Sequence, residues 1–443
     1  MTHLMISKKT LVLLFAILIL GLFLRHKDFR SSPRLGATFD EYAWTWLGMS
    51  LIEKHTPSSW SSYPQYEGYR EYKKYQGATF WIVKPYLEHP PLFGLIAGSF
   101  AIANGAKSMF DVDLEKIRPL ALILGVLSIF AVFLLVKELY DEKTALLASF
   151  IYALIPTVVI GSRLVQNENF FIPVFLLSLF LIFRFIKTKK DKFFLLTAFI
   201  CGLLTLAKVP WIAAGISIGL ILLYNRKYKH FLLLVGIVIS IFSLFIIYAY
   251  YYNWDLFISL WKFQFQRYEM AFNSVFTLFA EPYLADRFTI DGWIYFGWIS
   301  FFLLLAKNLR KNYILIFGLL GYLAVFVFAI PNTPGHGWYK YPFYPFLAIS
   351  LAIFIKDHFN KNLLFTFMFI LFTGLSLLEL TWTKTFGFSF SILRIFILLA
   401  GTSLLPLFFK NSKLKKYSRV FNYLMLIFIF FLSIWAVLAY NEQ

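Results

Sequence analysis

Long apolar runs recur along this 443-residue chain, and they limit its possible folds more than any other feature. A helix that crosses a bilayer needs about 17–25 mostly apolar residues. In hydrocarbon the backbone must satisfy its own hydrogen bonds, so such segments fold as helices. Thirteen runs approach this length, at residues 8–24, 119–136, 145–162, 170–186, 193–208, 210–225, 231–251, 292–306, 313–330, 342–355, 363–380, 391–409 and 421–439. The sequence therefore predicts an all-α polytopic membrane protein with about 13 transmembrane helices.

The composition supports this interpretation. Hydrophobic residues make up 60% of the chain and charged residues 15%, against about 45–50% and about 25% in soluble domains. The net charge of +19 comes from short basic tracts between the apolar runs. Such tracts are typical of loops that stay in the cytoplasm and contact anionic membrane lipids. We therefore expect no nucleic-acid partner. The single cysteine, Cys201, excludes an internal disulfide.

One short apolar run, 91–104, decides the predicted topology because it is too short to span comfortably. If it does not cross, the basic tracts all fall on one side, which the positive-inside rule assigns to the cytoplasm. These tracts are Lys8-Lys9, 187–192, 226–230, 307–311, 356–362 and 410–419. We therefore place 91–104 on the outer surface and expect the first span to remain uncleaved, with its N-terminus inside.

This topology predicts a single membrane domain, 1–443, with three outer loops at 25–118, 252–291 and 331–341. Long loops in compact proteins usually carry function. The second loop mixes aromatic and charged residues that suit sugars, and it is our candidate for acceptor or donor specificity. An interfacial helix is the simpler alternative for the same loop.

Two polar clusters lie in the first outer loop. Asp40 and Glu41 follow the first span closely, and adjacent carboxylates at a membrane boundary are costly unless solvated or used. A solvated helix cap is the alternative. Glu88 and His89 precede paired prolines that suit a helix start, and Lys84 stands four residues before Glu88. This cluster alone is also compatible with a simple helix-entry turn.

Two further clusters fall on the same predicted face. Arg163 and Glu168 lie between two spans, and arginine suits phosphate binding through paired hydrogen bonds. A structural ion pair between them is the alternative. His336, Tyr339 and Lys340 in the third outer loop add a cation and aromatic rings. Polar clusters from distant parts of the chain thus gather on one face of the membrane.

These motifs resemble those of the C-type glycosyltransferases (the GT-C fold). The resemblance rests on Asp40-Glu41 after the first span, His89-Pro90-Pro91 before the next helix, and Arg163 followed by a carboxylate five residues later. Lys340-Tyr341-Pro342 also looks like the family's basic-Tyr motif. Within the superfamily the chain is most similar to protein O-mannosyltransferases and the aminoarabinose transferases of lipid A. The resemblance implies juxtamembrane helices in the loop 25–118.

The resemblance also implies an inverting transfer from a polyprenyl-phosphate-linked sugar donor to a lipid, glycan or protein hydroxyl outside the membrane. Asp40 would be the catalytic base, and Glu41 would help to position a substrate. Arg163 and Lys340 would hold the lipid phosphate. The remaining expected donor-site residues are Lys84, Glu88, His89, Glu168, His336 and Tyr339. Glu168 stands where the family usually has aspartate, and its longer side chain keeps the charge but shifts its position by about one methylene.

The expected chemistry requires no metal, because a lipid phosphate is itself a good leaving group. Related oligosaccharyltransferases use a divalent ion, so a metal stays open. Two other functions compete with this interpretation. A transporter or flippase of lipid-linked sugars would suit the many spans, although few charges lie inside them. A glycan polymerase or ligase would use a lipid-diphosphate donor instead.

Overall fold

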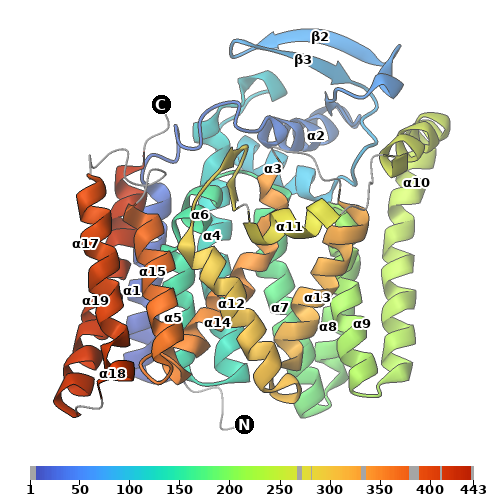
Figure 1. Ribbon diagram of the computed structural model, residues 1–443. Helices are drawn as coiled ribbons and strands as arrows, with labels where there is room; N and C mark the ends of the chain where they lie inside the picture. The colour runs from blue at the N-terminus through green and yellow to red at the C-terminus, as the bar shows by residue number, and fades with distance from the viewer. Residues whose placement is uncertain are drawn as a thin grey trace.

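The chain folds into a bundle of roughly parallel helices with a smaller layer of helices and strands across one end (Figure 1). The computed structural model describes residues 6–266, 272–280, 282–330, 336–378, 389–409 and 412–440. Among these residues, seven helical segments are long and apolar enough to cross a membrane. They are α1 (Lys8–His26), α4 (Leu114–Leu139), α7 (Asn167–Thr188), α10 (Tyr228–Gln266), α13 (Leu309–Ala329), α17 (Phe390–Gly401) with α18 (Leu405–Phe408), and α19 (Ser412–Ala439).

Shorter helices complete the bundle and lie alongside the long ones (Figure 1). They are α5 (Glu142–Leu154), α6 (Pro156–Gly161), α8 (Asp191–Ala207), α9 (Ile212–Tyr224), α12 (Gly292–Lys307), α14 (Tyr344–Asp357) and α15 (Leu363–Leu378). Each predicted apolar run contains one of these helices or one of the long ones, so the all-α polytopic class is confirmed. The number of 13 spans stays a prediction, because helices of 13 or 14 residues such as α9 and α14 are shorter than a bilayer core.

One predicted span is interrupted and one long helix bends just beyond its predicted span, each for an identifiable reason. The run 145–162 divides into α5 and α6 at Ile155, which precedes Pro156 and has extended ψ of 117°. α10 bends at Asn253, whose φ and ψ are −170° and 100°. The Asn253 side chain accepts a hydrogen bond from Leu256 N at 3.0 Å, which caps the segment that follows. Helix therefore extends into the second outer loop, and its interfacial position stays a prediction.

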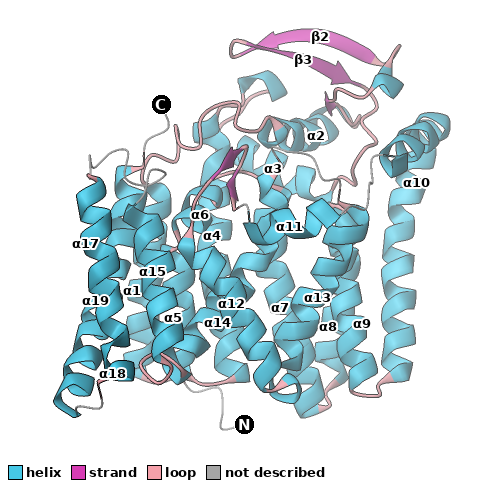
Figure 2. Cartoon of the chain, viewed as in Figure 1, coloured by secondary structure: helices cyan, strands magenta, loops and turns pink. Residues whose placement is uncertain are grey.

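The end layer is built from the first outer loop. It contains α2 (Asp40–Lys54), η1 (Pro64–Tyr66), α3 (Leu92–Ala103) and η2 (Met109–Asp111), which match the helices implied by the resemblance. It also contains an antiparallel sheet in the order β1-β3-β2, which the sequence interpretation did not predict (Figure 2). The strands are β1 (Ser59–Trp60), β2 (Arg70–Tyr75) and β3 (Ala78–Val83), and Tyr75 pairs with Ala78 across a two-residue turn.

α3 corresponds to the short apolar run 91–104, and it packs on α2 at this end of the bundle (Figure 1). The two helices approach closely because glycines face each other. A Cβ atom on Gly48 would lie 1.8 Å from the Gly94 carbonyl oxygen, and one on Gly98 would lie 2.4 Å from Met49 N. This small-residue contact fixes the position of α2, which begins with Asp40.

The second and third outer loops contribute α11 (Phe272–Ala280), the short strands β4 (Tyr283–Leu284) and β5 (Arg287–Phe288), and the 3-10 segment η4 (Gly337–Phe343). Residues 267–271, 281 and 331–335 of these loops lie outside the described residues. The described segments lie at the same end of the bundle as α2 (Figure 1). This end, opposite the N-terminus, is therefore where the predicted outer loops come together.

Candidate active site

A cavity of about 440 Å³ lies at this end of the bundle, and we call it the Asp40 cavity. α2, the turn after α8, the far end of α10 and η4 contribute to its wall. The polar and titratable lining residues include Asp40, Ser61, Ser62, Tyr63, Tyr86, Glu88, His89, Lys208, Gln264, His336 and Tyr339. Several elements that are distant in sequence thus place acids, bases and aromatic rings around one space.

Asp40 is the first residue of α2, so its carboxylate lies at the positive end of the helix dipole. Its backbone N–H donates to Thr38 Oγ1 at 3.1 Å, and Gln166 Nε2 donates to the same hydroxyl at 2.9 Å. Burial raises the pKa of Asp40 above its ordinary value, while the Lys208 ammonium and a hydrogen bond from Gln166 oppose the rise. A carboxylate with a raised pKa is better matched to general-base work near neutral pH.

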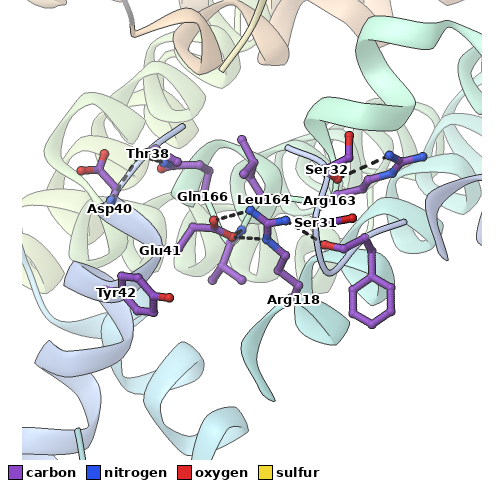
Figure 3. A network of polar contacts seen from close by, with 12 residues as sticks. Ser31, Ser32, Thr38, Asp40, Glu41, Tyr42, Arg118, Arg163, Leu164 and Gln166 are labelled. Atoms are coloured by element: carbon purple, nitrogen blue, oxygen red, sulfur yellow. Dashed lines mark hydrogen bonds and ion pairs between the residues drawn. The ribbon is translucent and has the colours of Figure 1, made fainter. Parts of the chain in front are cut away.

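Glu41 points in a different direction from Asp40 and faces Arg118 (Figure 3). Arg118 Nε and Nη2 donate to the two Glu41 oxygens at 3.1 and 2.8 Å, and Val165 N donates to Oε1 at 2.9 Å. Both side chains of the ion pair are buried. Glu41 does not line the Asp40 cavity. In the structure it joins the start of α2 to α4, and the substrate-positioning role stays a prediction.

Lys208 is a cavity residue that the sequence interpretation missed. It follows α8 directly, and its ammonium pairs with Glu168 Oε1 at 2.8 Å while lying 4.3 Å from the centre of the Tyr339 ring. The Trp44 and Trp211 rings are also within 6 Å, at 5.9 and 5.5 Å. A signal was available, because a lysine at the outer end of an apolar run runs against the positive-inside rule.

Glu168 and Arg163 do not form the ion pair that was considered as an alternative. The Glu168 carboxylate is buried against Lys208, and its Oε2 atom has no hydrogen-bond partner among the described residues. The turn that carries Lys208 is held by Asn167, whose side chain donates to Ala207 O at 2.8 Å and accepts from Trp211 Nε1 at 2.6 Å. The start of α7 therefore positions Lys208 through two consecutive residues.

Arg163 lies apart from the Asp40 cavity, at the other end of the polar network in Figure 3. Its guanidinium is fully buried and donates to Leu24 O at 3.0 Å and to Ser32 O at 3.4 Å. Burial lowers the pKa of Arg163 to about 10. These contacts tie the end of α1 and the start of the first loop to the α6–α7 turn. The phosphate-binding role of Arg163 remains a prediction that this geometry does not support.

The other predicted site residues divide into two groups. Glu88, His89, His336 and Tyr339 line the Asp40 cavity. The His89 ring lies against Trp44, with ring centres 5.0 Å apart. The structure thus brings these four residues together with Asp40, although they come from different outer loops.

Lys84 and Lys340 lie outside the cavity wall. Lys84 is exposed after β3. Lys340 is buried in η4, where its ammonium donates to Thr277 O at 2.7 Å and lies 4.8 Å from the centre of the Tyr283 ring. Lys340 therefore anchors α11 to η4 in this structure, and its predicted contact with phosphate is untested.

The fit of a divalent metal can be examined from the same residues. Asp40, Glu88, His89 and His336 share the cavity wall. Within the described part of the chain, however, no three His, Cys, Asp or Glu side chains are grouped closely enough to hold a metal ion. The described cavity residues therefore do not fit a divalent metal, and the proposed reaction uses none.

Part of this chain matches a known protein family, and its fold is similar to those of solved proteins. Residues 88–251 match the family described as dolichyl-phosphate-mannose-protein mannosyltransferase. ArnT from Cupriavidus metallidurans bound to undecaprenyl phosphate aligns with a TM-score of 0.59 at 13% identity, covering 98% of this chain and 77% of that one. Comparison with curated protein sequences gives no match.

Two larger enzymes also share the fold. The Archaeoglobus fulgidus oligosaccharyltransferase aligns with a TM-score of 0.51 at 14% identity, covering 93% of this chain and 56% of that chain. The arabinosyltransferase EmbB from Mycobacterium smegmatis aligns with a TM-score of 0.56 at 12% identity, covering 99% of this chain and 42% of that chain. This chain therefore spans only about half the length of these two proteins. The likenesses show a GT-C fold and confirm the resemblance to the C-type membrane glycosyltransferases.

Proposed function

We propose that this protein is an inverting glycosyltransferase that moves a sugar from a polyprenyl-phosphate donor to a hydroxyl acceptor on the outer side of the membrane. The observation that carries the proposal is that a carboxylate, Asp40, and a lysine ammonium, Lys208, line the same cavity at the predicted outer end of the bundle. The ArnT structure contains undecaprenyl phosphate, and an AglB structure from Archaeoglobus fulgidus contains a dolichol-phosphate. A lipid-phosphate donor fits the same fold.

The proposed reaction is a single displacement. The acceptor hydroxyl oxygen attacks the anomeric carbon from the face opposite the phosphate and gives its proton to the Asp40 carboxylate. The bond between the anomeric carbon and the phosphate oxygen breaks, and polyprenyl phosphate departs with the electron pair. The configuration at the anomeric carbon inverts. Asp40 suits the role of base because burial raises its pKa while Lys208 keeps it from rising further.

Lys208 is the candidate cation for the leaving phosphate. Negative charge gathers on the phosphate oxygen as the sugar bond breaks, and a fixed cation nearby stabilises that transition state. Lys208 is held by Glu168 at 2.8 Å and lies in the cavity wall. Arg163 and Lys340 were the expected phosphate ligands, but their contacts lie elsewhere. The proposal therefore transfers this role to Lys208, with His89 and His336 as further donors in the same wall.

The test combines purified protein, a membrane extract as the source of acceptor hydroxyls, and synthetic polyprenyl phosphates that carry mannose, arabinose or aminoarabinose, and it measures the release of polyprenyl phosphate. With the donor that wild type uses, we expect Asp40→Asn to lower the rate about 10²–10⁴-fold, the usual effect of losing a positioned base. Asp255→Asn is the matched control, because Asp255 is exposed on α10.

Wild-type-like turnover of Asp40→Asn would remove Asp40 from the catalytic role. A wild-type protein that cleaves none of these donors but moves lipid-linked sugars across vesicle membranes would instead identify a flippase. Cleavage only of lipid-diphosphate donors would identify a polymerase or ligase.

A further inference from the structure

A second cavity, of about 390 Å³, lies at the opposite end of the bundle, and we call it the lysine cavity. It is enclosed by the start of α5, the turn between α12 and α13, and the end of α14. These helix ends lie at the same end of the bundle as the N-terminus (Figure 1). Its charged lining residues are Asp141, Lys307, Lys311, Lys356 and Asp357.

The ammonium groups of this cavity outnumber its carboxylates. Lys356 pairs with Asp141 and donates to Thr144 Oγ1 at 2.8 Å, while Lys307 lies 3.8 Å from Asp357. Among the described residues, no carboxylate pairs with Lys311. Its ammonium lies 5.5 Å from the centre of the Tyr140 ring instead. The cavity therefore retains a positive charge that its own acids do not neutralise.

Helix ends of both kinds meet at this cavity, because α4, α12 and α14 end there. Both α5 and α13 begin at the cavity, where Asp141 and Asn308 accept hydrogen bonds from Thr144 N at 2.9 Å and Lys311 N at 3.0 Å. Helix N-termini carry partial positive charge and C-termini partial negative charge, so the lysine side chains are the source of the positive potential of the cavity.

The cavity also has a polar floor beside an apolar wall. Tyr140 Oη donates to Asn312 Oδ1 at 2.5 Å, and Asn312 Nδ2 donates to Asn308 O at 2.9 Å. Leu304 and Ile353 line the same space. A ligand with a phosphate head and an adjoining apolar part would match both surfaces, and a purely ionic ligand would use only the first.

We propose that the lysine cavity binds the phosphate group of an anionic ligand, either an anionic phospholipid headgroup or a soluble phosphate compound. Basic pockets between transmembrane helices on the cytoplasmic side are a recurrent form of headgroup site. The predicted topology places this end of the bundle there. The cavity lies at the other end of the bundle from the Asp40 cavity, so the proposal stands independently of the transfer reaction.

The experiment measures binding of phosphatidylglycerol and of phosphatidylcholine to the purified protein by native mass spectrometry. We expect selective retention of phosphatidylglycerol and about fivefold weaker binding when Lys311 or Lys307 is changed to glutamine, the effect of one lysine near an anionic surface. Lys311→Arg keeps the charge and should restore binding. Lys229→Gln is the matched control, since Lys229 is exposed at the same end, at the start of α10.

Inorganic phosphate separates the two possible sources. If millimolar phosphate leaves phosphatidylglycerol binding unchanged, the ligand is a lipid headgroup. If phosphate displaces the lipid or stabilises the lipid-free protein in a Lys311-dependent way, the site takes soluble phosphate. Equal retention of the two phospholipids together with no effect of phosphate would overturn the proposal. Equal losses in Lys311→Gln and Lys229→Gln would overturn it as well.

Discussion

The charges of Asp40 and Lys208 interact, and this interaction predicts how the transfer rate depends on pH. Burial raises the pKa of Asp40, and the Lys208 ammonium opposes that rise. Removing the ammonium with Lys208→Met should therefore raise the pKa of Asp40 further. Asp40 would then be protonated at a higher pH and unable to accept a proton. We expect the acid limb of the kcat/KM profile to move to higher pH, and Lys208→Arg to keep it near the wild-type position.

A control variant is needed, because Lys208→Met alone leaves Glu168 buried without its partner. Breaking a buried ion pair on one side typically destabilises a protein by about 3–5 kcal/mol. The double variant Lys208→Met/Glu168→Gln removes both charges in a more stable protein, and its acid limb should move less than in Lys208→Met, because the Glu168 carboxylate also interacts with Asp40. An acid limb that stays in place in folded Lys208→Met would show that Lys208 does not act on the catalytic carboxylate.

Glu41 is the neighbour of Asp40, but we expect its substitution to lower the stability of the protein. It is buried in a two-point ion pair with Arg118, at 2.8 Å for the closer contact. We expect Glu41→Gln to lower the free energy of unfolding by about 3–5 kcal/mol, because Arg118 would keep a buried charge without a partner. The unfolding midpoint in detergent measures this, with Glu71→Gln on exposed β2 as the control.

The comparison with Asp40→Asn distinguishes a structural role from a catalytic one. Asp40→Asn should lose transfer and keep the wild-type unfolding midpoint. A Glu41→Gln protein that keeps its stability but loses transfer would mean that Glu41 contacts a substrate after all.

The packing of α2 against α3 sets the position of Asp40. A Cβ on Gly48 would lie 1.8 Å from the Gly94 carbonyl oxygen, so Gly48→Ala must push the helices apart. Overpacking of this kind usually costs about 1–3 kcal/mol. We expect Gly48→Ala to lower both the unfolding midpoint and the transfer rate, since the shifted helix begins at Asp40.

Gly236→Ala is the matched control for this prediction. Gly236 lies within α10, and a Cβ there would meet no atom within 4 Å. The same fall in rate for both variants would mean that loss of glycine itself, and not the α2–α3 contact, is responsible. A wild-type rate for Gly48→Ala would show that the site tolerates movement of α2.

The two cavities lie at opposite ends of the bundle (Figure 1). The predicted topology assigns these ends to opposite sides of the membrane. The N- and C-terminal ends also lie at opposite ends of the bundle, as an odd number of crossings requires. Lys74 is exposed on β2 and Lys413 is exposed at the start of α19.

These two lysines test the topology after each is changed to cysteine. A membrane-impermeant thiol reagent applied to intact cells should label Lys74→Cys and leave Lys413→Cys unlabelled until the membrane is opened. Native Cys201 is buried and gives little background. Labelling of Lys413→Cys in intact cells would reverse the predicted orientation.

The sequence determined the membrane class, the helical segments and four of the polar residues that join Asp40 in the cavity. It could do so because hydrocarbon leaves a backbone few alternatives to helix and because uncompensated polar groups at a membrane boundary stand out in an apolar sequence. The β2–β3 hairpin was missed although Gln76-Gly77 carries a local signal, with φ of 46° and 77° as a tight hairpin turn requires.

Only the tertiary structure decided which charges meet. Arg163, Lys208 and Lys340 are all cations near the outer ends of helices, yet only Lys208 reaches the Asp40 cavity. Glu168 pairs with Lys208, 40 residues away in sequence, while Arg163 binds backbone carbonyls. Sequence spacing cannot select such partners, because a buried charge takes whichever partner the packing of distant helices brings within hydrogen-bonding distance.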